Sequence, residues 1–161
     1  MLKFSKKVEY AIISMLYMAE QEKEQLSTTR ELAETFNIPQ ELVGKVLQSL
    51  AKNGCINSVQ GVKGGYQLAK EPDQINLGEI ILAVDGPVKV VNCVDEIDSC
   101  SCEQLDFCNM RNPMETIQSK LITFFNSVSL KDLQANYIPH DIANANIQGK
   151  GHNVAFINRV N

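Results

Sequence analysis

Apolar side chains recur at steps of three and four residues over the first part of the chain. This period places them on one stripe of an α-helix, so the pattern predicts a helix over residues 5–22. A polar stretch, QEKEQ, follows and ends the element. The stripe consists of Val8, Ala11, Ile12, Met15, Leu16 and Ala19.

The next segment, LSTTRELAETFNIPQELVGKVLQSLAKNG (26–54), predicts two helices separated by a tight break. Thr28 and Glu31 have the spacing of a capping box that begins a helix. Asn37-Ile38-Pro39 interrupts the pattern, with the proline suited to the first turn of the second helix. That helix ends at Asn53-Gly54. Its apolar stripe consists of Leu42, Val43, Val46, Leu47 and Leu50. A short helix, a tight turn and a longer helix form a helix-turn-helix.

The segment CINSVQGVKGGYQLAK (55–70) predicts a β-hairpin with a glycine-rich tip. Ile56 and Val59 precede a turn over residues 61–65, and Tyr66 and Leu68 alternate after it. A helix-turn-helix closed by such a hairpin is a winged helix. Cys55, at the start of the first strand, is expected to be a small core residue.

The second half predicts three further helical pieces. INLGEIILAVDGP (75–87) is a short helix that starts near Leu77 and ends at Gly86-Pro87. Pro113 opens a longer helix to about Ser127, and SLKDL (129–133) is one more capped turn. A loop over 92–112 lies between them, and the aperiodic tail from residue 134 is expected to be loosely ordered. The apolar face of the long helix is Met114, Ile117, Leu121, Phe124, Phe125 and Val128.

Composition and charge refine this picture. The chain has 161 residues and an ordinary hydrophobic content, which suits one compact domain or a small domain with an appendage. No apolar run approaches the roughly eighteen residues that span a bilayer, and no secretory signal is apparent, so a cytoplasmic protein without a membrane partner is expected. The net charge is −4, but residues 1–70 hold nine Lys/Arg and seven Asp/Glu, whereas residues 71–161 hold six and twelve. The basic first half and acidic second half indicate two functional halves.

The second helix of the helix-turn-helix predicts a DNA-binding face. Residues on its exposed side can meet base edges or phosphates: Gln40, Glu41, Gly44, Lys45, Gln48 and Lys52. Thr28 and Thr29, at the start of the preceding helix, complete this face. Lys3, Lys6, Lys7 and Lys63 are candidate phosphate contacts. The alternative is a pair of packed helices in any small α-helical domain.

The hairpin tip, QGVKGGY (60–66), is a second candidate DNA contact, through Gln60, Gly61, Lys63 and Gly64. Glycine lets a backbone approach a narrow groove closely, and Lys63 adds positive charge. For Gly64 and Gly65, a plain hairpin turn that needs glycine is the alternative.

Four of the five cysteines lie within CVDEIDSCSCEQLDFC (93–108). Their spacing lacks the paired knuckles of structural zinc, and the two histidines, His140 and His152, are far away. Open, unequal spacing is more typical of an iron–sulfur cluster. The acidic residues between the cysteines disfavour free thiolates, and a ferric cluster would relieve that repulsion. A thiol–disulfide switch and an inert solvated loop remain alternatives.

With helix, wing and cysteine loop in this order, the chain resembles the IscR/NsrR family of bacterial winged-helix regulators. The resemblance runs from about Leu2 to Leu133. The motifs that carry it are KVEYAIISMLYMA, LVGKVLQSLAKNG, GVKGGYQLAK, LGEIILAVDGP, the cysteine loop and ITFFNSVSLKDL.

The resemblance implies a homodimer built on the long helix (113–128) that binds a two-fold operator of double-stranded DNA. It also implies an iron–sulfur cluster, 2Fe–2S or 4Fe–4S, on three loop cysteines. These are Cys93, Cys102 and Cys108 here, with Cys100 as the alternate. In one branch of the family an acidic residue at the start of the first helix reaches the partner's cluster, and Glu9 of the partner subunit would be that ligand.

Four positions depart from the family pattern. Arg111 and Ile13 stand where particular branches have a histidine ligand. Gln60 replaces an arginine that enters the minor groove in many members, so affinity at the tip would depend on Lys63. Gly44 stands where some members have a base-reading acid, so the operator sequence does not transfer.

The expected fold is therefore mainly α with a small β-hairpin wing, a winged helix-turn-helix plus a long C-terminal dimerisation helix. The expected boundaries are 1–86 for the DNA-binding domain and 87–112 for the cluster-binding loop. Residues 113–133 would form the dimerisation helix with a short terminal helix, and 134–161 a weakly ordered tail.

The expected function is a homodimeric transcriptional regulator, usually repressing, whose cluster senses redox state, nitric oxide, iron or cluster supply. The alternatives are a cluster-free thiol- or ligand-sensing regulator on the same fold, and an iron–sulfur electron-transfer or carrier protein. An enzyme is not expected, because no nucleophile–base pair is apparent and GVKGG lacks the spacing of a phosphate-binding loop.

Overall fold

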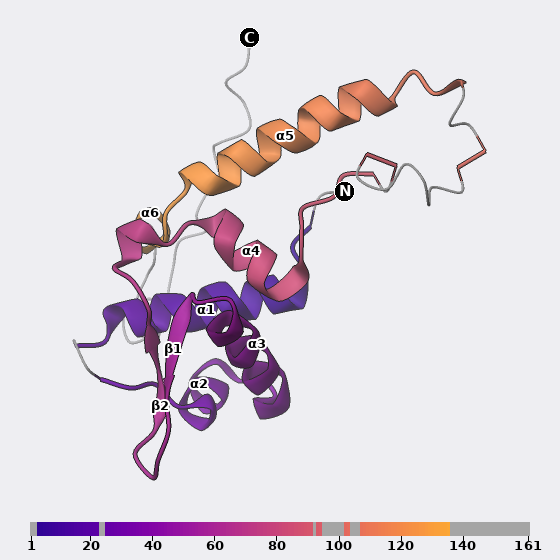
Figure 1. Cartoon of the computed structure of the whole chain (residues 1–161). Helices are drawn as coiled ribbons and strands as arrows, with labels where there is room; N and C mark the ends of the chain where they lie inside the picture. The colour runs from indigo at the N-terminus through magenta and orange to yellow at the C-terminus, as the bar shows by residue number, and fades with distance from the viewer. Residues whose placement is uncertain (1–2, 23–24, 92, 95–101, 104–106, 136–161) are drawn as a thin grey trace, which may run out of the picture.

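The computed structural model describes residues 3–22, 25–91, 93–94, 102–103 and 107–135. Over these residues the chain is mainly helical with one antiparallel β-hairpin (Figure 1), which confirms the expected fold class. The elements are α1 (Lys6–Glu20), α2 (Thr29–Phe36), α3 (Gln40–Lys52), β1 (Ile56–Val59), β2 (Gly65–Leu68), the 3-10 turn η1 (Pro72–Gln74), α4 (Leu77–Asp85), α5 (Arg111–Ser127) and α6 (Leu130–Gln134). The tail over 136–161 lies outside the described residues, and no described helix is long and apolar enough to cross a membrane.

The helix-turn-helix forms as its capping residues predict. The Thr28 hydroxyl accepts a hydrogen bond from the Glu31 backbone N–H at 3.1 Å, and the Glu31 carboxylate accepts one from the Thr28 backbone N–H at 3.2 Å. Asn37 turns the chain with a left-handed φ of 51°, which its short polar side chain tolerates. Pro39 precedes α3 instead of lying in its first turn, and its carbonyl accepts from the Val43 N–H at 3.2 Å.

The apolar stripe of α3 is correct in four of its five residues. Val43, Val46, Leu47 and Leu50 are buried, but Leu42 is 42% exposed. Successive side chains on a helix diverge by about 100°, so Leu42 points away from Val43 toward the edge of the buried face. It lines a hollow between α1 and α3 instead of the core.

The wing is a two-stranded hairpin in which Ile56 pairs with Leu68 and Val59 pairs with Gly65. Ser27 and Tyr66 exchange two backbone hydrogen bonds of 2.9 Å, which join the hairpin to the start of α2. A side chain on Gly64 would lie 2.3 Å from the Val59 carbonyl oxygen, and one on Gly65 would lie 2.9 Å from that of Ser27. Glycine is therefore required by the hairpin itself at these two positions.

The second half of the chain folds back on the first. The Leu77 N–H donates to the Val128 carbonyl at 2.8 Å, and the Leu130 N–H donates to the Ile75 carbonyl at 2.8 Å. These bonds join the end of α5 to the start of α4. In Figure 1, α5 lies beyond α4, on the opposite side of the molecule from the wing tip. It begins at Arg111, two residues before the predicted start, with Pro113 in its first turn, where a missing N–H breaks no helical bond.

The core is shared by α1, the helix-turn-helix, the base of the wing and α4. Its fully buried large side chains include Met15, Leu32, Leu47, Ile56 and Ile80. Burying each such side chain stabilises the fold by about 1.5–3 kcal/mol. The core therefore fixes the direction in which the opposite face of α3 points.

Candidate nucleic-acid interface and cysteine segment

The polar face of α3 points away from the core. Gln40, Glu41, Lys45, Gln48 and Lys52 are exposed, as the sequence predicts, and Gly44 is half-buried. The Lys45 ammonium Nζ donates to the Glu41 carboxylate Oε1 at 2.6 Å. This hydrogen bond, followed by the attraction between the two charges, lowers the pKa of Glu41. The face thus presents a pair of opposite charges together with the amide side chains of Gln40 and Gln48.

Gly44 is not required by packing. A side-chain carbon placed there would meet only Thr29 Cγ2, at an ordinary contact distance of 3.7 Å. Glycine inside a helix costs about 1 kcal/mol relative to alanine. A glycine that the fold does not need, on the face predicted to meet DNA, is compatible with close approach of a ligand to the α3 backbone.

The two threonines at the start of α2 have different surroundings. Thr28 is exposed, but its hydroxyl already caps α2 through Glu31, and Thr29 is half-buried next to Gly44. The cap therefore fixes the Thr28 side chain, and only part of Thr29 is accessible to a partner.

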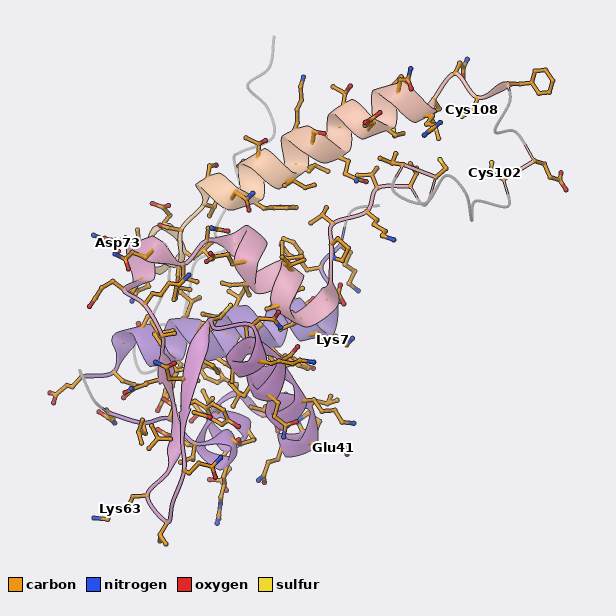
Figure 2. All side chains as sticks on the ribbon, in the orientation of Figure 1. Lys7, Glu41, Lys63, Asp73, Cys102 and Cys108 are labelled. Carbon is orange, nitrogen blue, oxygen red and sulfur yellow. The ribbon has the colours of Figure 1, made fainter. Side chains whose placement is uncertain are left out.

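The wing tip extends from the same side of the molecule as the start of α3. Figure 2 shows Lys63 at the far end of the hairpin and Glu41 at the adjacent end of α3. Gln60, Gly61 and Lys63 are exposed, and Gly64 is half-buried. Val62 is fully exposed and was missed by the sequence reasoning. The sequence could have indicated this exposure, because an apolar residue in so short a turn cannot return to the core.

The lysines at the start of α1 are exposed but have acidic neighbours. Lys6 donates to the Glu9 carboxylate, and this hydrogen bond, together with the charge of Glu9, raises the pKa of Lys6. The Lys7 ammonium lies 4.0 Å from the Asp85 carboxylate. Both lysines line a hollow of about 300 Å³ with Tyr10, Leu42, Lys45, Val46, Ser49 and Val84.

The described cysteines of the loop lie between α4 and α5. Cys93 and Cys108 are half-buried free thiols, and Cys102 is exposed. In Figure 2, Cys108 lies near the first turn of α5 and Cys102 lies farther from that helix. Among the described residues, no three His, Cys, Asp or Glu side chains come close enough to hold a metal ion. Cys100 lies outside the described residues. The ligand set therefore stays a prediction.

Two further candidate residues, Glu9 and Cys55, lie within the described part of the chain. Glu9, in the first turn of α1, is half-buried and pairs with Lys6 of its own chain. Cys55 is buried in the core, and this burial, with a smaller effect from Glu79, raises the pKa of its thiol. Thiolates are the reactive form, so Cys55 is a packing residue and not a reactive site.

Helix α5 leaves part of its predicted apolar face exposed. Phe125 is buried against the core, but Phe124 is 58% exposed and Ile117 is exposed as well. Ile122, which was not part of that predicted face, is also exposed. Gln118, in contrast, is buried, and its Oε1 accepts from the Val90 backbone N–H at 3.0 Å.

Comparisons with known proteins agree with this arrangement. The profile of the Rrf2 family, described as an iron-dependent transcriptional regulator, matches residues 4–136. NsrR of Shouchella clausii, an HTH-type transcriptional regulator, is 28% identical over 128 residues, covering 80% of this chain and 85% of its own. The structure of CymR, the global cysteine regulator of B. subtilis, superposes with a TM-score of 0.65 at 26% identity, over 86% of this chain and 100% of that one. IscR of T. potens superposes with a TM-score of 0.64 at 25% identity, over 93% and 94%.

Proposed function

Because the chain belongs to the Rrf2 family of DNA-binding transcriptional regulators, which are not enzymes, we propose that it is a homodimeric repressor controlled by an iron–sulfur cluster. The observation that carries the proposal is the position of the cysteine segment. It joins α4, which packs on the DNA-binding half, to α5, which has an exposed apolar face. A change at the cysteines is thus adjacent to both the DNA-binding half and the proposed dimer helix.

The proposed dimer interface is the apolar side of α5. Ile117 and Phe124 are exposed in the single chain and, being seven residues apart, lie on the same side of the helix. Exposed apolar side chains that share one side of a helix are typical of protein–protein interfaces. A two-fold dimer on α5 would present two copies of α3 and two wings to a two-fold operator.

The proposed ligands are Cys93, Cys102 and Cys108, with Glu9 of the partner subunit as the fourth. Thiolates are the usual protein ligands of iron–sulfur clusters, and a cluster would supply sensitivity to redox state, nitric oxide, iron or cluster supply. A carboxylate is a harder ligand than a thiolate, so Glu9 would be the easiest of the four to displace. Cys100 is the alternate to Cys102.

A second candidate is a regulator on the same fold that senses thiol chemistry without a cluster. The observation that favours it is the likeness to CymR, which is described as a global cysteine regulator. Exposure of Cys102 supports the same candidate, since reactive cysteines need access to solvent. In either case the protein acts where the bacterial DNA lies, which is the cytoplasm.

Anaerobic purification followed by an absorption spectrum and an iron and sulfide count tests the cluster. A mobility-shift assay on the DNA upstream of its own gene, with and without cluster, tests control of DNA binding. The proposal predicts visible absorbance, bound iron and a change in operator affinity when the cluster is removed. DNA binding by a protein that holds no iron even after anaerobic purification would favour the thiol sensor. Bound iron without DNA binding would favour an electron-transfer or carrier protein.

A further inference from the structure

The ion pair on α3 lies where a recognition helix reads bases. Lys45 and Glu41 are joined at 2.6 Å, and their side chains remain 67% and 78% exposed. Val43, Val46 and Leu47 hold the opposite side of the helix in the core. We propose that the Glu41–Lys45 pair reads a G·C base pair in the major groove. Glu41 accepts from cytosine N4, and Lys45 donates to guanine O6 and N7. The inference rests on the DNA-binding function proposed above.

The pattern of donors and acceptors on this base pair is complementary to the ion pair. In the major groove, guanine presents two acceptors, N7 and O6, beside the N4 donor of cytosine. The N4 and O6 atoms are joined by a base-pairing hydrogen bond, so they lie about 2.9 Å apart. The Glu41 oxygen and the Lys45 nitrogen lie 2.6 Å apart with the opposite polarity. Each charged group can therefore meet its partner on the base pair without separating from the other.

An A·T pair matches this arrangement less well. Its order is the N7 acceptor, the N6 donor, the O4 acceptor and then the thymine methyl group. The two acceptors are separated by the donor, so Lys45 cannot reach both while Glu41 occupies N6. On the thymine side, an ammonium group beside O4 would also face the methyl group. The ion pair consequently distinguishes G·C from A·T.

Charge compensation makes the carboxylate acceptable near DNA. A lone carboxylate in the major groove is repelled by the phosphates, whereas the ammonium of Lys45 neutralises this one at close range. Lys45 lowers the pKa of Glu41, which favours the ionised form, and an ionised carboxylate only accepts hydrogen bonds. Gly44, on the same face, has no side chain that would hold the base edge away from the pair.

Selection of binding sites from random double-stranded DNA by the full chain tests the inference. The wild type should select a G·C pair at one symmetric position in each half-site. Glu41→Gln should shift that position toward A·T, because a glutamine amide pairs with adenine N6 and N7. Affinity for the wild-type site should fall about tenfold. Lys45→Gln should weaken the preference for guanine at the same position.

Glu34→Gln is a matched control. Glu34 accepts from Arg30 at 2.8 Å, in an exposed ion pair of the same spacing on α2. The control removes the same charge as Glu41→Gln but should leave the selected sequence unchanged. Circular dichroism should show that wild type and Glu41→Gln are both folded. If the two then select the same sequence, the inference that this ion pair reads the base pair is wrong, while the DNA-binding function is unaffected. If the wild type enriches no sequence, both this inference and the DNA-binding function on which it rests are wrong.

Discussion

The side-chain oxygen Oε1 of Gln118 accepts a hydrogen bond of 3.0 Å from the backbone N–H of Val90. Gln118 is only 5% exposed, although many of its neighbours on α5 face solvent. Val90 stands three residues before Cys93, so this bond fastens the chain just ahead of the cysteine segment to α5. A buried polar group that loses its partner lowers the stability of the fold, so this contact contributes to holding α5 in place.

Replacing Gln118 by methionine should destabilise the fold. Methionine keeps the length of the side chain but removes the acceptor, which leaves the Val90 N–H without this bond in a half-buried position. The free energy of unfolding should fall by about 1–2 kcal/mol in urea titrations. The Val90 amide should also exchange faster with solvent deuterium. Ser119→Ala is the control, since that exposed hydroxyl donates to the Glu115 carbonyl within its own helix. Equal stability of the two variants would contradict the role of Gln118.

Replacing Gly44 by alanine should stabilise the protein and weaken DNA binding. The new methyl group meets only Thr29 Cγ2, at 3.7 Å, so the helix gains up to about 1 kcal/mol. Operator affinity should fall, because the methyl group occupies space beside the base-reading face. Urea unfolding and mobility shift measure the two effects. Gly54→Ala is the control, since φ there is +73° and alanine should destabilise the fold. Unchanged affinity of Gly44→Ala would show that DNA does not approach this position closely.

The buried thiol of Cys55 should make the fold less stable in alkaline solution. Burial raises its pKa above the ordinary value of 9.0, so above that pH the unfolded chain loses a proton that the folded chain retains. Stability is therefore complete below the ordinary pKa and falls as pH rises past it. Cys55→Ala should remove this part of the alkaline decline while lowering stability at pH 7 through lost packing. Unfolding curves at pH 7 and above pH 9 measure the difference. A decline that is the same in both proteins would exclude Cys55 as its source.

Replacing Phe124 by aspartate should shift the dimer toward monomer. Phe124 is exposed in the single chain, so the change costs little folding stability but places a charge in the proposed interface. Sedimentation velocity at several concentrations should show a dimer for the wild type and a smaller species for the variant. Thr116→Asp, at an exposed polar position of the same helix, should leave the dimer intact. A wild-type monomer at all concentrations would remove the dimer from the proposed function.

Glu9→Ala should yield a dimer that holds its cluster poorly. The loss of a fourth ligand should lower both the visible absorbance and the iron per chain after anaerobic purification. Glu22→Ala, just after the end of α1, is the control for a lost carboxylate. Cluster content equal to that of the wild type would exclude Glu9 as a ligand.

The two neighbouring loop cysteines can be separated by the same measurement. Cys102→Ala should lose the iron, whereas Cys100→Ala should retain it. The reverse result would assign the ligand to Cys100 instead. Retention of iron in both variants would exclude both thiols as required ligands.

The sequence alone determined the features that depend on near neighbours in the chain. The capping box of Thr28 and Glu31, the turn at Asn37 and the end of α3 at Asn53-Gly54 all formed where the pattern predicted them. Helical period and cap hydrogen bonds act over three or four residues, so they are legible without the fold. The ordered set of motifs also identified the family, because it records the order of elements and not their packing.

The tertiary structure decided which face of each element is covered. Leu42 was predicted to be a core residue but lies at the edge of its stripe, and Gln118, a polar residue of α5, is buried and bonded to the half-buried Val90. Burial depends on which distant element packs against a face, and helical period does not specify that element. For the same reason, only the fold showed that Gly44 is optional for packing while Gly64 is required. Gly64 is therefore explained by the hairpin, whereas Gly44 is available for DNA recognition.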